Sequence, residues 1–140
     1  MPKSPLEWLK GAAFAAALYL SIPGKPLPAP RPRFSRNGHT YMPQTYGDWR
    51  KTAQSALESS IPASPIDGPV TVAIMVRGPK PKKTVLAFPR GDTDNYAKSV
   101  LDLLTSIKVW LDDTQVGTLM VRKRWENDDN PPGFTVWVAP

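Results

Sequence analysis

The chain lacks cysteine and contains a single histidine, His39. The missing thiols exclude disulfide bonds, thiolate zinc sites and cysteine nucleophiles, and they favour a cytoplasmic location. One imidazole is too few for a histidine-rich metal cage within one chain, or for a motif that needs two histidines. Carboxylates are therefore the remaining candidates for metal ligands.

A membrane-spanning hydrophobic run is also missing. Residues 11–22 are apolar and follow Lys3 and Lys10, as in a secretory signal, but the segment is too short to cross a bilayer as a helix. The turn-forming residues 23–26 follow it in place of a small-residue cleavage site. We expect no signal peptide and no membrane partner, and instead an Ala-rich helix from about Pro5 that leads into the first strand. Residues 1–17 would form an N-terminal extension and residues 18–140 the functional domain.

Length and charge narrow the class of protein. At 140 residues the chain fits one domain with one core. Its 18 Lys and Arg outnumber 12 Asp and Glu, for a net charge of +6 and a pI near 9.7. A basic domain favours nucleic acid as a partner, although ribosomal and other basic proteins share this property.

The 17 prolines fall mostly within residues 23–43 and 62–89, which predicts loops there. Residues 27–39 are extended and basic, with a glycine near the end, and predict an arm or hairpin. We expect its arginines to contact DNA phosphates: Arg31, Arg33 and Arg36.

Hydrophobic spacing predicts the remaining elements. Residues 46–59 and 94–107 have the three- and four-residue apolar spacing of amphipathic helices. Residues 70–76 alternate like a strand with one buried face, residues 84–88 form a second expected strand, and residues 118–125 and 134–138 alternate like a pair of strands. Phe88 is expected in the core. This order predicts an α+β fold with a mixed, mostly antiparallel sheet covered by helices.

Five aspartates concentrate near the second predicted helix: Asp92, Asp94, Asp102, Asp112 and Asp113. So many carboxylates repel one another unless a positive charge lies between them, and a hard divalent cation suits them. Asp92 and Asp94 would project to the same side if their segment is extended. The chain must then return along a helix about 18 Å long to bring Asp112 and Asp113 to them, and we expect Trp110 and Leu111 to anchor this return.

Such a site suits phosphodiester hydrolysis, with Mg²⁺ supplying a hydroxide and stabilising the leaving oxygen. Lys98 lies one turn beyond Asp94 and could contact the scissile phosphate. Ordinary structural roles remain open for each residue. Asp92 or Asp94 could cap the helix, residues 112–114 could form a solvated turn, and Lys98 could pair with Asp94 or Asp102.

The combined pattern resembles a known family. The residues are Asp92-x-Asp94-Asn95-x-x-Lys98-x-x-x-Asp102-x-Leu104 and Val109-x-x-Asp112-Asp113-x-Gln115-Val116, after Ile22-Pro23-Gly24-Lys25-Pro26, Arg31-Pro32-Arg33 and Tyr41-x-Pro43. They are similar to the signature of RusA-type Holliday-junction resolvases of phages and prophages, from about Leu18 to the C-terminus.

This resemblance implies a RusA-like homodimer that nicks two opposed strands of a four-way DNA junction with Mg²⁺ as cofactor, in DNA recombination and repair. The metal ligands would be Asp92, Asp94 and Asp113, with Asp112 in a supporting role and Lys98 as the catalytic lysine. The cell would be a bacterium or a phage-infected host. Two symmetric nicks also call for two equivalent sites, and hence for a dimer.

Further cations are candidates for contact with the DNA backbone: Lys80, Lys82, Lys83 and Arg90. Solubility is an equal explanation for the lysines. Two other hypotheses remain open: a non-catalytic protein that binds junctions or branched DNA, and a basic membrane-surface protein that uses its Ala-rich N-terminus.

Overall fold

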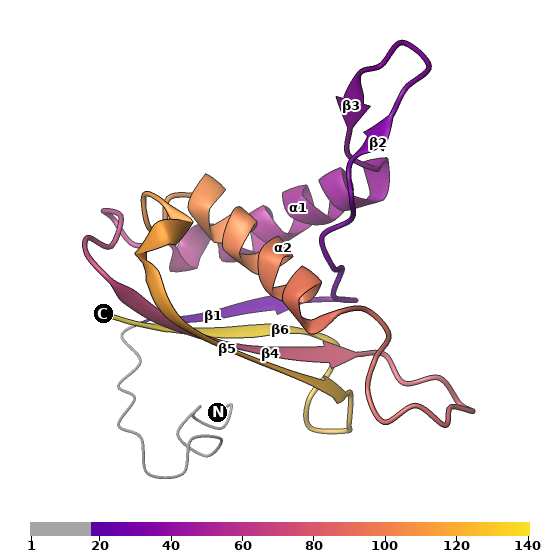
Figure 1. The fold of residues 1–140 in the computed structure, drawn as a ribbon. Helices are drawn as coiled ribbons and strands as arrows, with labels where there is room; N and C mark the ends of the chain where they lie inside the picture. The colour runs from indigo at the N-terminus through magenta and orange to yellow at the C-terminus, as the bar shows by residue number, and fades with distance from the viewer. Residues whose placement is uncertain (1–17) are drawn as a thin grey trace.

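The computed structural model describes residues 18–140. A four-stranded sheet carries two helices on one face, and a small hairpin projects beyond them (Figure 1). The predicted N-terminal helix and extension, residues 1–17, lie outside the described residues. Within residues 18–140, no helix is long and apolar enough to span a membrane.

The sheet contains β1 (Leu18–Pro23), β6 (Gly133–Ala139), β4 (Val70–Gly78) and β5 (Val116–Trp125), in that order. The pairs β1–β6 and β6–β4 are antiparallel, and β4–β5 is parallel. The parallel pair requires a crossover, which α2 (Thr93–Ser106) provides. The prediction of an α+β fold with a mixed, mostly antiparallel sheet and helices is therefore confirmed.

Strand β4 supplies the centre of the core. The predicted inward-facing residues Val70, Val72, Ile74 and Val76 are all buried and belong to one cluster with the helices. The intervening Ala73 and Met75 are buried too, in a second cluster on the opposite face with Trp137 and Ala139. A strand with a neighbour on each side and buried side chains on both faces has this nearly continuous hydrophobic pattern.

Both long helices were predicted within two residues of their observed bounds. Helix α2 buries Ala97, Val100 and Leu104 against the sheet, as its apolar stripe predicted. Helix α1 (Gln44–Leu57) buries Ala53 and Leu57 and is followed by the 3₁₀ turn η2 (Glu58–Ser60). These two helices form the layer that covers the sheet (Figure 1).

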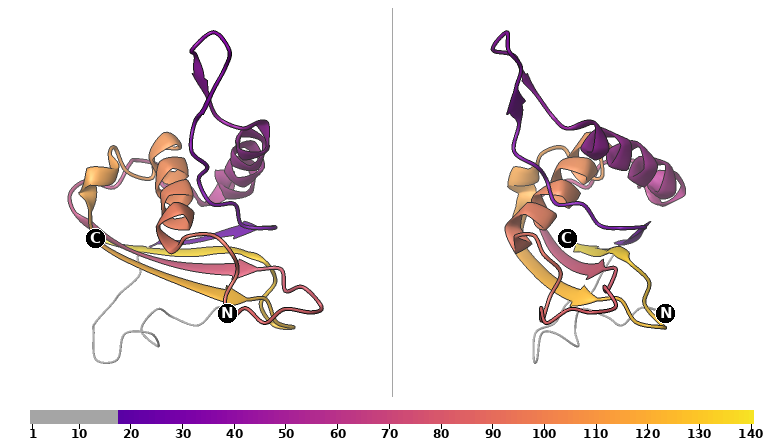
Figure 2. Two further views of the ribbon diagram at one scale, coloured as in Figure 1. Left: turned by 45° about the vertical axis from the view of Figure 1, so that its right-hand side comes forward. Right: turned by 90° about the vertical axis from the view of Figure 1, so that its right-hand side faces the viewer.

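The basic arm forms the predicted hairpin. Strands β2 (Arg33–Phe34) and β3 (Thr40–Tyr41) pair antiparallel. Gly38 adopts a φ of 78° in the connecting turn, a conformation that glycine adopts without a steric penalty. Figure 2 shows the hairpin extending away from the sheet and helices.

Residues 84–88 do not form the predicted strand; they belong to a loop, residues 79–92, that joins β4 to α2. A strand here needs a free sheet edge beside β4, but β6 and β5 pair with both edges of β4. Pro81 and Pro89 also remove backbone donors from the segment. Phe88 was predicted in the core, but it is 55% exposed because the loop lies outside the sheet.

Two further expectations were wrong. The strands predicted at 118–125 and 134–138 exist as β5 and β6, but β4 lies between them and they do not pair with each other. Of the two residues expected to anchor the return after α2, Trp110 is fully buried whereas Leu111 is 61% exposed. The chain turns at residues 111–113, which leaves the Leu111 side chain in solvent.

Candidate active site

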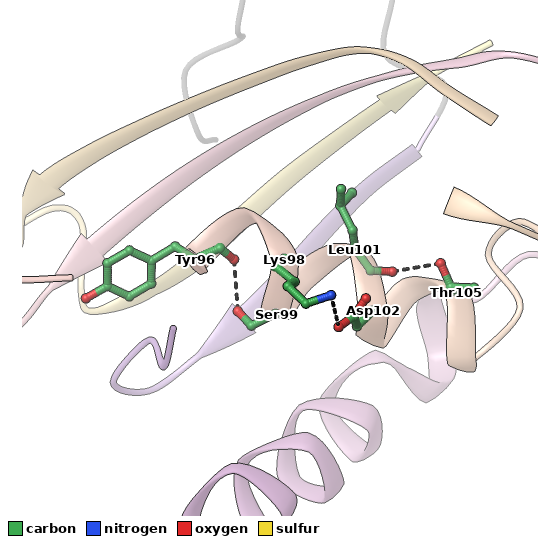
Figure 3. Close-up of polar contacts among 6 residues, drawn as sticks. All are labelled: Tyr96, Lys98, Ser99, Leu101, Asp102 and Thr105. Carbon is green, nitrogen blue, oxygen red and sulfur yellow. Dashed lines mark hydrogen bonds and ion pairs between the residues drawn. The ribbon is translucent and has the colours of Figure 1, made fainter. Parts of the chain in front are cut away.

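Helix α2 presents a polar row opposite to its buried stripe. Asp94, Lys98 and Asp102 follow one another at four-residue intervals, which places them on one side of a helix. Figure 3 shows Lys98 and Asp102 on successive turns. The hydroxyls of Ser99 and Thr105 donate to carbonyls of their own helix and add nothing to this row.

This row lines a pocket of about 470 Å³. Asp113, in the 3₁₀ turn η3 (Asp113–Gln115), lines it as well, and Leu119 and Val121 of β5 provide apolar wall. The structure thus brings three of the four predicted catalytic residues, Asp94, Lys98 and Asp113, to one pocket. We call it the acidic pocket.

Two side chains fix the position of the segment after α2 that brings Asp113 to the pocket. The Trp110 indole Nε1–H donates to Thr105 Oγ1 at 2.7 Å. The Gln115 amide donates to the carbonyls of Ile66 and Gly68, both at 2.9 Å, and its oxygen accepts from the Asp112 backbone N–H. Sequence reasoning missed the role of Gln115, because its partners lie almost fifty residues away along the chain.

Asp112 and Asp113 have different environments despite being adjacent. Asp112 accepts a hydrogen bond from the Thr114 backbone N–H at 3.0 Å and caps η3, and this bond lowers the pKa of Asp112. The side-chain hydrogen bond with Asp112 raises the pKa of Asp113, and the negative charge of Asp102 raises it further. The Asp113 side chain thus lies in excess negative charge.

Asp92 and Asp112 do not line the acidic pocket. Asp92 is the N-cap residue of α2, although its side chain makes no capping hydrogen bond. The helix begins at Thr93, so Asp94 lies in the first helical turn and the two aspartates do not share one face of an extended segment. That expectation was wrong because the strand thought to lead into it is absent.

The carboxylates form a row and not a compact cluster. Asp94 and Asp102 are separated by two turns, about 12 Å along a helix axis. Asp113 lines the same pocket as Asp94 and Asp102. In residues 18–140, no three acidic or histidine side chains are close enough to hold a metal ion. The predicted convergence of Asp113 with Asp92 and Asp94 stays a prediction.

The acidic pocket nevertheless suits a hard divalent cation chemically. Its polar groups include three aspartates, which supply oxygen ligands. The interaction with Asp112 raises the pKa of Asp113 most, and the negative charges of Asp112 and Asp102, which a bound cation would offset, raise it further. Asp94 and Asp113 are exposed, so their side chains can change rotamer at little cost.

Lys98 Nζ lies 3.3 Å from the Asp102 carboxylate (Figure 3). This is one of the structural roles that the sequence left open. The side chains are 63% and 34% exposed, so the pair contributes at most about 0.5 kcal/mol to stability. Lys98 can therefore leave Asp102 for a phosphate at low cost.

All the predicted DNA-contacting cations are exposed. Arg31, Arg33 and Arg36 lie on or beside the projecting hairpin, and the other four lie on the loop of residues 79–92. Within the described residues 18–140, no ion pair involves any of these seven side chains. Their charges are therefore available to a polyanion.

Lys123 of β5 is a further residue that sequence reasoning missed. Its Nζ donates to the carbonyls of Pro89 at 3.1 Å and Gly91 at 2.7 Å. These bonds hold the chain immediately before Asp92 against the sheet. The alternating pattern of β5 identified a strand, but it did not show which loop this side chain would reach.

The fold and the acidic pocket agree with the comparison with known families. The family model Endodeoxyribonuclease RusA matches residues 23–138. The chain therefore belongs to the RusA endodeoxyribonuclease family, and it is a nuclease of the kind that acts on Holliday junctions. No curated protein matches it.

Proposed function

We propose that this protein is a homodimeric, Mg²⁺-dependent endonuclease that resolves four-way DNA junctions by paired symmetric nicks. The observation that carries the proposal is the acidic pocket, where Asp94, Lys98 and Asp113 come together from two separate elements. Family membership supports the same activity. The nuclease would act in the cytoplasm of a bacterium or a phage-infected host, in DNA recombination and repair.

Asp94 and Asp113 would hold the metal, with Asp92 at the N-terminus of α2 as the third ligand and Asp112 in support. When bound, Mg²⁺ lowers the pKa of a coordinated water and stabilises charge on the phosphate oxygens. Asp112 already has a role in the fold, because its side chain caps η3, the turn that carries Asp113. Its support would therefore consist of fixing the position of the Asp113 carboxylate.

Lys98 would contact the scissile phosphate. Lys98 lies between Asp94 and Asp102 in the sequence of the helix, and its ion pair with Asp102 is exposed. The scissile phosphodiester carries one negative charge, like a carboxylate, and gains more during attack, so it would compete for the same donor. Lys98 would then offset the negative charge that develops on the phosphate during attack.

The exposed cations would bind the DNA backbone around this site. The hairpin with Arg31, Arg33 and Arg36 on or beside it projects beyond the helices, and the loop that contains Lys80, Lys82, Lys83 and Arg90 leads into α2 (Figure 2). Backbone contacts of this kind position DNA without reading its sequence. A second protomer would supply the second active site that paired nicks require.

The test is incubation of the protein with a synthetic four-way junction and with a linear duplex of the same sequence, with and without Mg²⁺. We expect paired nicks on the junction alone, and only with the metal. Asp113→Asn should lower the cleavage rate at least about 100-fold, since a metal ligand matters more than the supporting groups whose loss already costs up to that much.

Asp128→Asn is the matched control, because Asp128 is an exposed aspartate in the turn before β6 and lies far from α2 in the sequence. It should cleave like the unaltered protein. A non-catalytic junction-binding protein is the rival, since the described carboxylates do not form a compact trio. Junction binding without Mg²⁺-dependent cleavage in the unaltered protein would establish that rival.

A further inference from the structure

A second concave surface lies at the N-terminal end of α2, outside the acidic pocket. It is a groove of about 880 Å³ between the loop of residues 79–91, the segment of residues 25–28 and the beginning of α1. Figure 1 shows this loop and the N-terminal end of α2 next to each other at the same end of the sheet. We call it the basic groove.

The walls of the basic groove are held by specific bonds. The Trp125 indole Nε1–H donates to the Leu86 carbonyl at 3.0 Å, and the Tyr96 hydroxyl donates to the Arg90 carbonyl at 2.5 Å. Pro89 packs so closely on Gly78 that a Cβ at that glycine would lie 2.7 Å from the proline ring. A loop tied at several points to α2 and β5 forms a site before any ligand binds.

The lining combines apolar surface with positive charge. Prolines, Leu86 and the aromatic side chains of Tyr96 and Trp125 line the groove. Lys25, Lys83 and Arg90 also line it, and none of the described residues that do so is Asp or Glu. A nucleotide combines a flat aromatic base with a negatively charged phosphate, so apolar surface beside cations is complementary to it.

Among nucleic acids, this lining favours an unpaired nucleotide over a base pair. Bases inside a duplex have both faces covered by their neighbours, whereas an unpaired base can place a free face on Trp125 or Leu86. The groove volume of about 880 Å³ is within the range of small-molecule pockets and is too small for a duplex.

We propose that the basic groove binds one unpaired nucleotide of a DNA strand, with its base on the Trp125 and Leu86 wall and its phosphate at Lys25, Lys83 and Arg90. Arg90 and Gly91 directly precede Asp92, so the bound nucleotide lies next to the proposed cleavage site along the chain. The proposal rests on the proposed function in requiring a DNA substrate. It adds that the protein prefers DNA with unpaired bases.

Binding of the full-length protein should be measured in EDTA, where metal-dependent cleavage cannot occur. The probes are a duplex with one unpaired nucleotide and the same duplex fully paired, and the readout is the ratio of their dissociation constants. Thr45 lines the groove from α1, where it is exposed, so Thr45→Trp fills the groove without touching the loop bonds. We expect it to abolish a preference of about tenfold for the unpaired probe.

Lys83→Ala and Lys82→Ala form a matched pair, because both remove one lysine from the same loop and only Lys83 lines the groove. Lys83→Ala should reduce the preference for the unpaired probe, whereas Lys82→Ala should weaken binding to both probes equally and leave the preference unchanged. A 5-iododeoxyuridine at the unpaired position should photocrosslink to a peptide that contains Trp125 or Tyr96.

An unchanged ratio in a folded Thr45→Trp variant, or crosslinks confined to other peptides, would overturn the proposal. A groove that serves a protein partner would also leave the ratio unchanged. Junction cleavage by the unaltered protein separates the two proposals: cleavage with no groove effect refutes the groove alone. A groove effect without cleavage refutes the nuclease proposal alone.

Discussion

The acidic pocket and the basic groove both border α2, but they are built differently. The groove is closed by bonds from Trp125 and Tyr96 to backbone carbonyls of the loop. In the acidic pocket the proposed catalytic side chains are exposed or partly exposed, and the ion pair on its wall, Lys98 with Asp102, is solvent-accessible.

This difference fits the two proposed ligands, a metal ion in the acidic pocket and a nucleotide base in the basic groove. A neutral base binds by shape, so its site gains from walls that are fixed in advance. Carboxylates that would bind a cation repel one another in its absence, which favours exposed and separated side chains. The pKa of Asp113 is raised mainly by its interaction with Asp112, and the negative charge of Asp102 contributes in the same direction. Substitutions in the two regions should accordingly have different consequences, for activity in the pocket and for stability around the groove.

The largest expected effect is on activity in the acidic pocket. Lys98→Met keeps the aliphatic stem and removes the ammonium group, and we expect the junction cleavage rate to fall about 100-fold. The free energy of unfolding should change by less than about 0.5 kcal/mol, because the pair with Asp102 is exposed. Lys51→Met, on the exposed side of α1, is the control and should cleave normally. A fall in the free energy of unfolding large enough to explain the lower cleavage rate would contradict this prediction.

Next in size is an effect on stability beside the groove. Gly91 has a φ of 105°, and a Cβ there would lie 2.9 Å from the Tyr96 ring. Gly91→Ala should lower the free energy of unfolding by about 2 kcal/mol in urea denaturation. Gly24→Ala serves as the control, because Gly24 has a φ of 96° but open space around its Cα. If Gly24→Ala lowers the free energy of unfolding less than Gly91→Ala does, the difference measures the clash with Tyr96. Equal losses would mean that the positive φ alone causes the effect.

A smaller effect is expected from the bond that closes the groove. Tyr96→Phe removes the hydroxyl that donates to the Arg90 carbonyl and should cost about 1 kcal/mol. Burial also raises the pKa of Tyr96 above 10.0, so the neutral phenol is favoured in the folded state. Its stabilising contribution is therefore present below about pH 10 and lost as the pH rises through the folded pKa.

Urea denaturation of the unaltered protein and Tyr96→Phe between pH 8 and pH 11 tests both statements. The difference in stability between the two proteins should shrink as Tyr96 ionises. A difference that stays constant across this range would show that Tyr96 does not titrate differently in the folded and unfolded states.

The smallest effect should have the opposite sign. Tyr46 is buried in α1, and within residues 18–140 its hydroxyl has no hydrogen-bond partner. Its ring stacks on Trp49, with 5.9 Å between the centroids, and phenylalanine would preserve that contact. Tyr46→Phe should therefore raise the free energy of unfolding by about 0.5 kcal/mol, measured in urea beside Tyr96→Phe. A loss as large as that of Tyr96→Phe would mean that the Tyr46 hydroxyl is satisfied in solution.

Elements with local signals were predicted well. The alternation of β4 and the apolar stripe of α2 identified a strand and a helix because each pattern repeats with the period of its own backbone. The hairpin of the basic arm also followed from local turn chemistry, with Gly38 in the turn. The motif around α2 pointed to the residues that meet in the acidic pocket.

Elements that depend on a distant neighbour were predicted badly. Residues 84–88 have the composition of a strand, but β5 pairs with the edge of β4 that a strand there would need. Phe88 was expected in the core for the same reason and is exposed. The basic groove could not be predicted at all, since its lining comes from four separate parts of the chain.

The sequence by itself determined the positive charge, the helix that carries Asp94, Lys98 and Asp102 in a row, and the family to which the chain belongs. Those properties are local, because spacing along a helix sets the direction of each side chain. Only the tertiary structure decided that Asp113 faces this row and that the loop before Asp92 closes over a basic groove. Both depend on bonds between residues far apart in the chain, such as those of Gln115 to Ile66 and of Trp125 to Leu86, which local spacing does not specify.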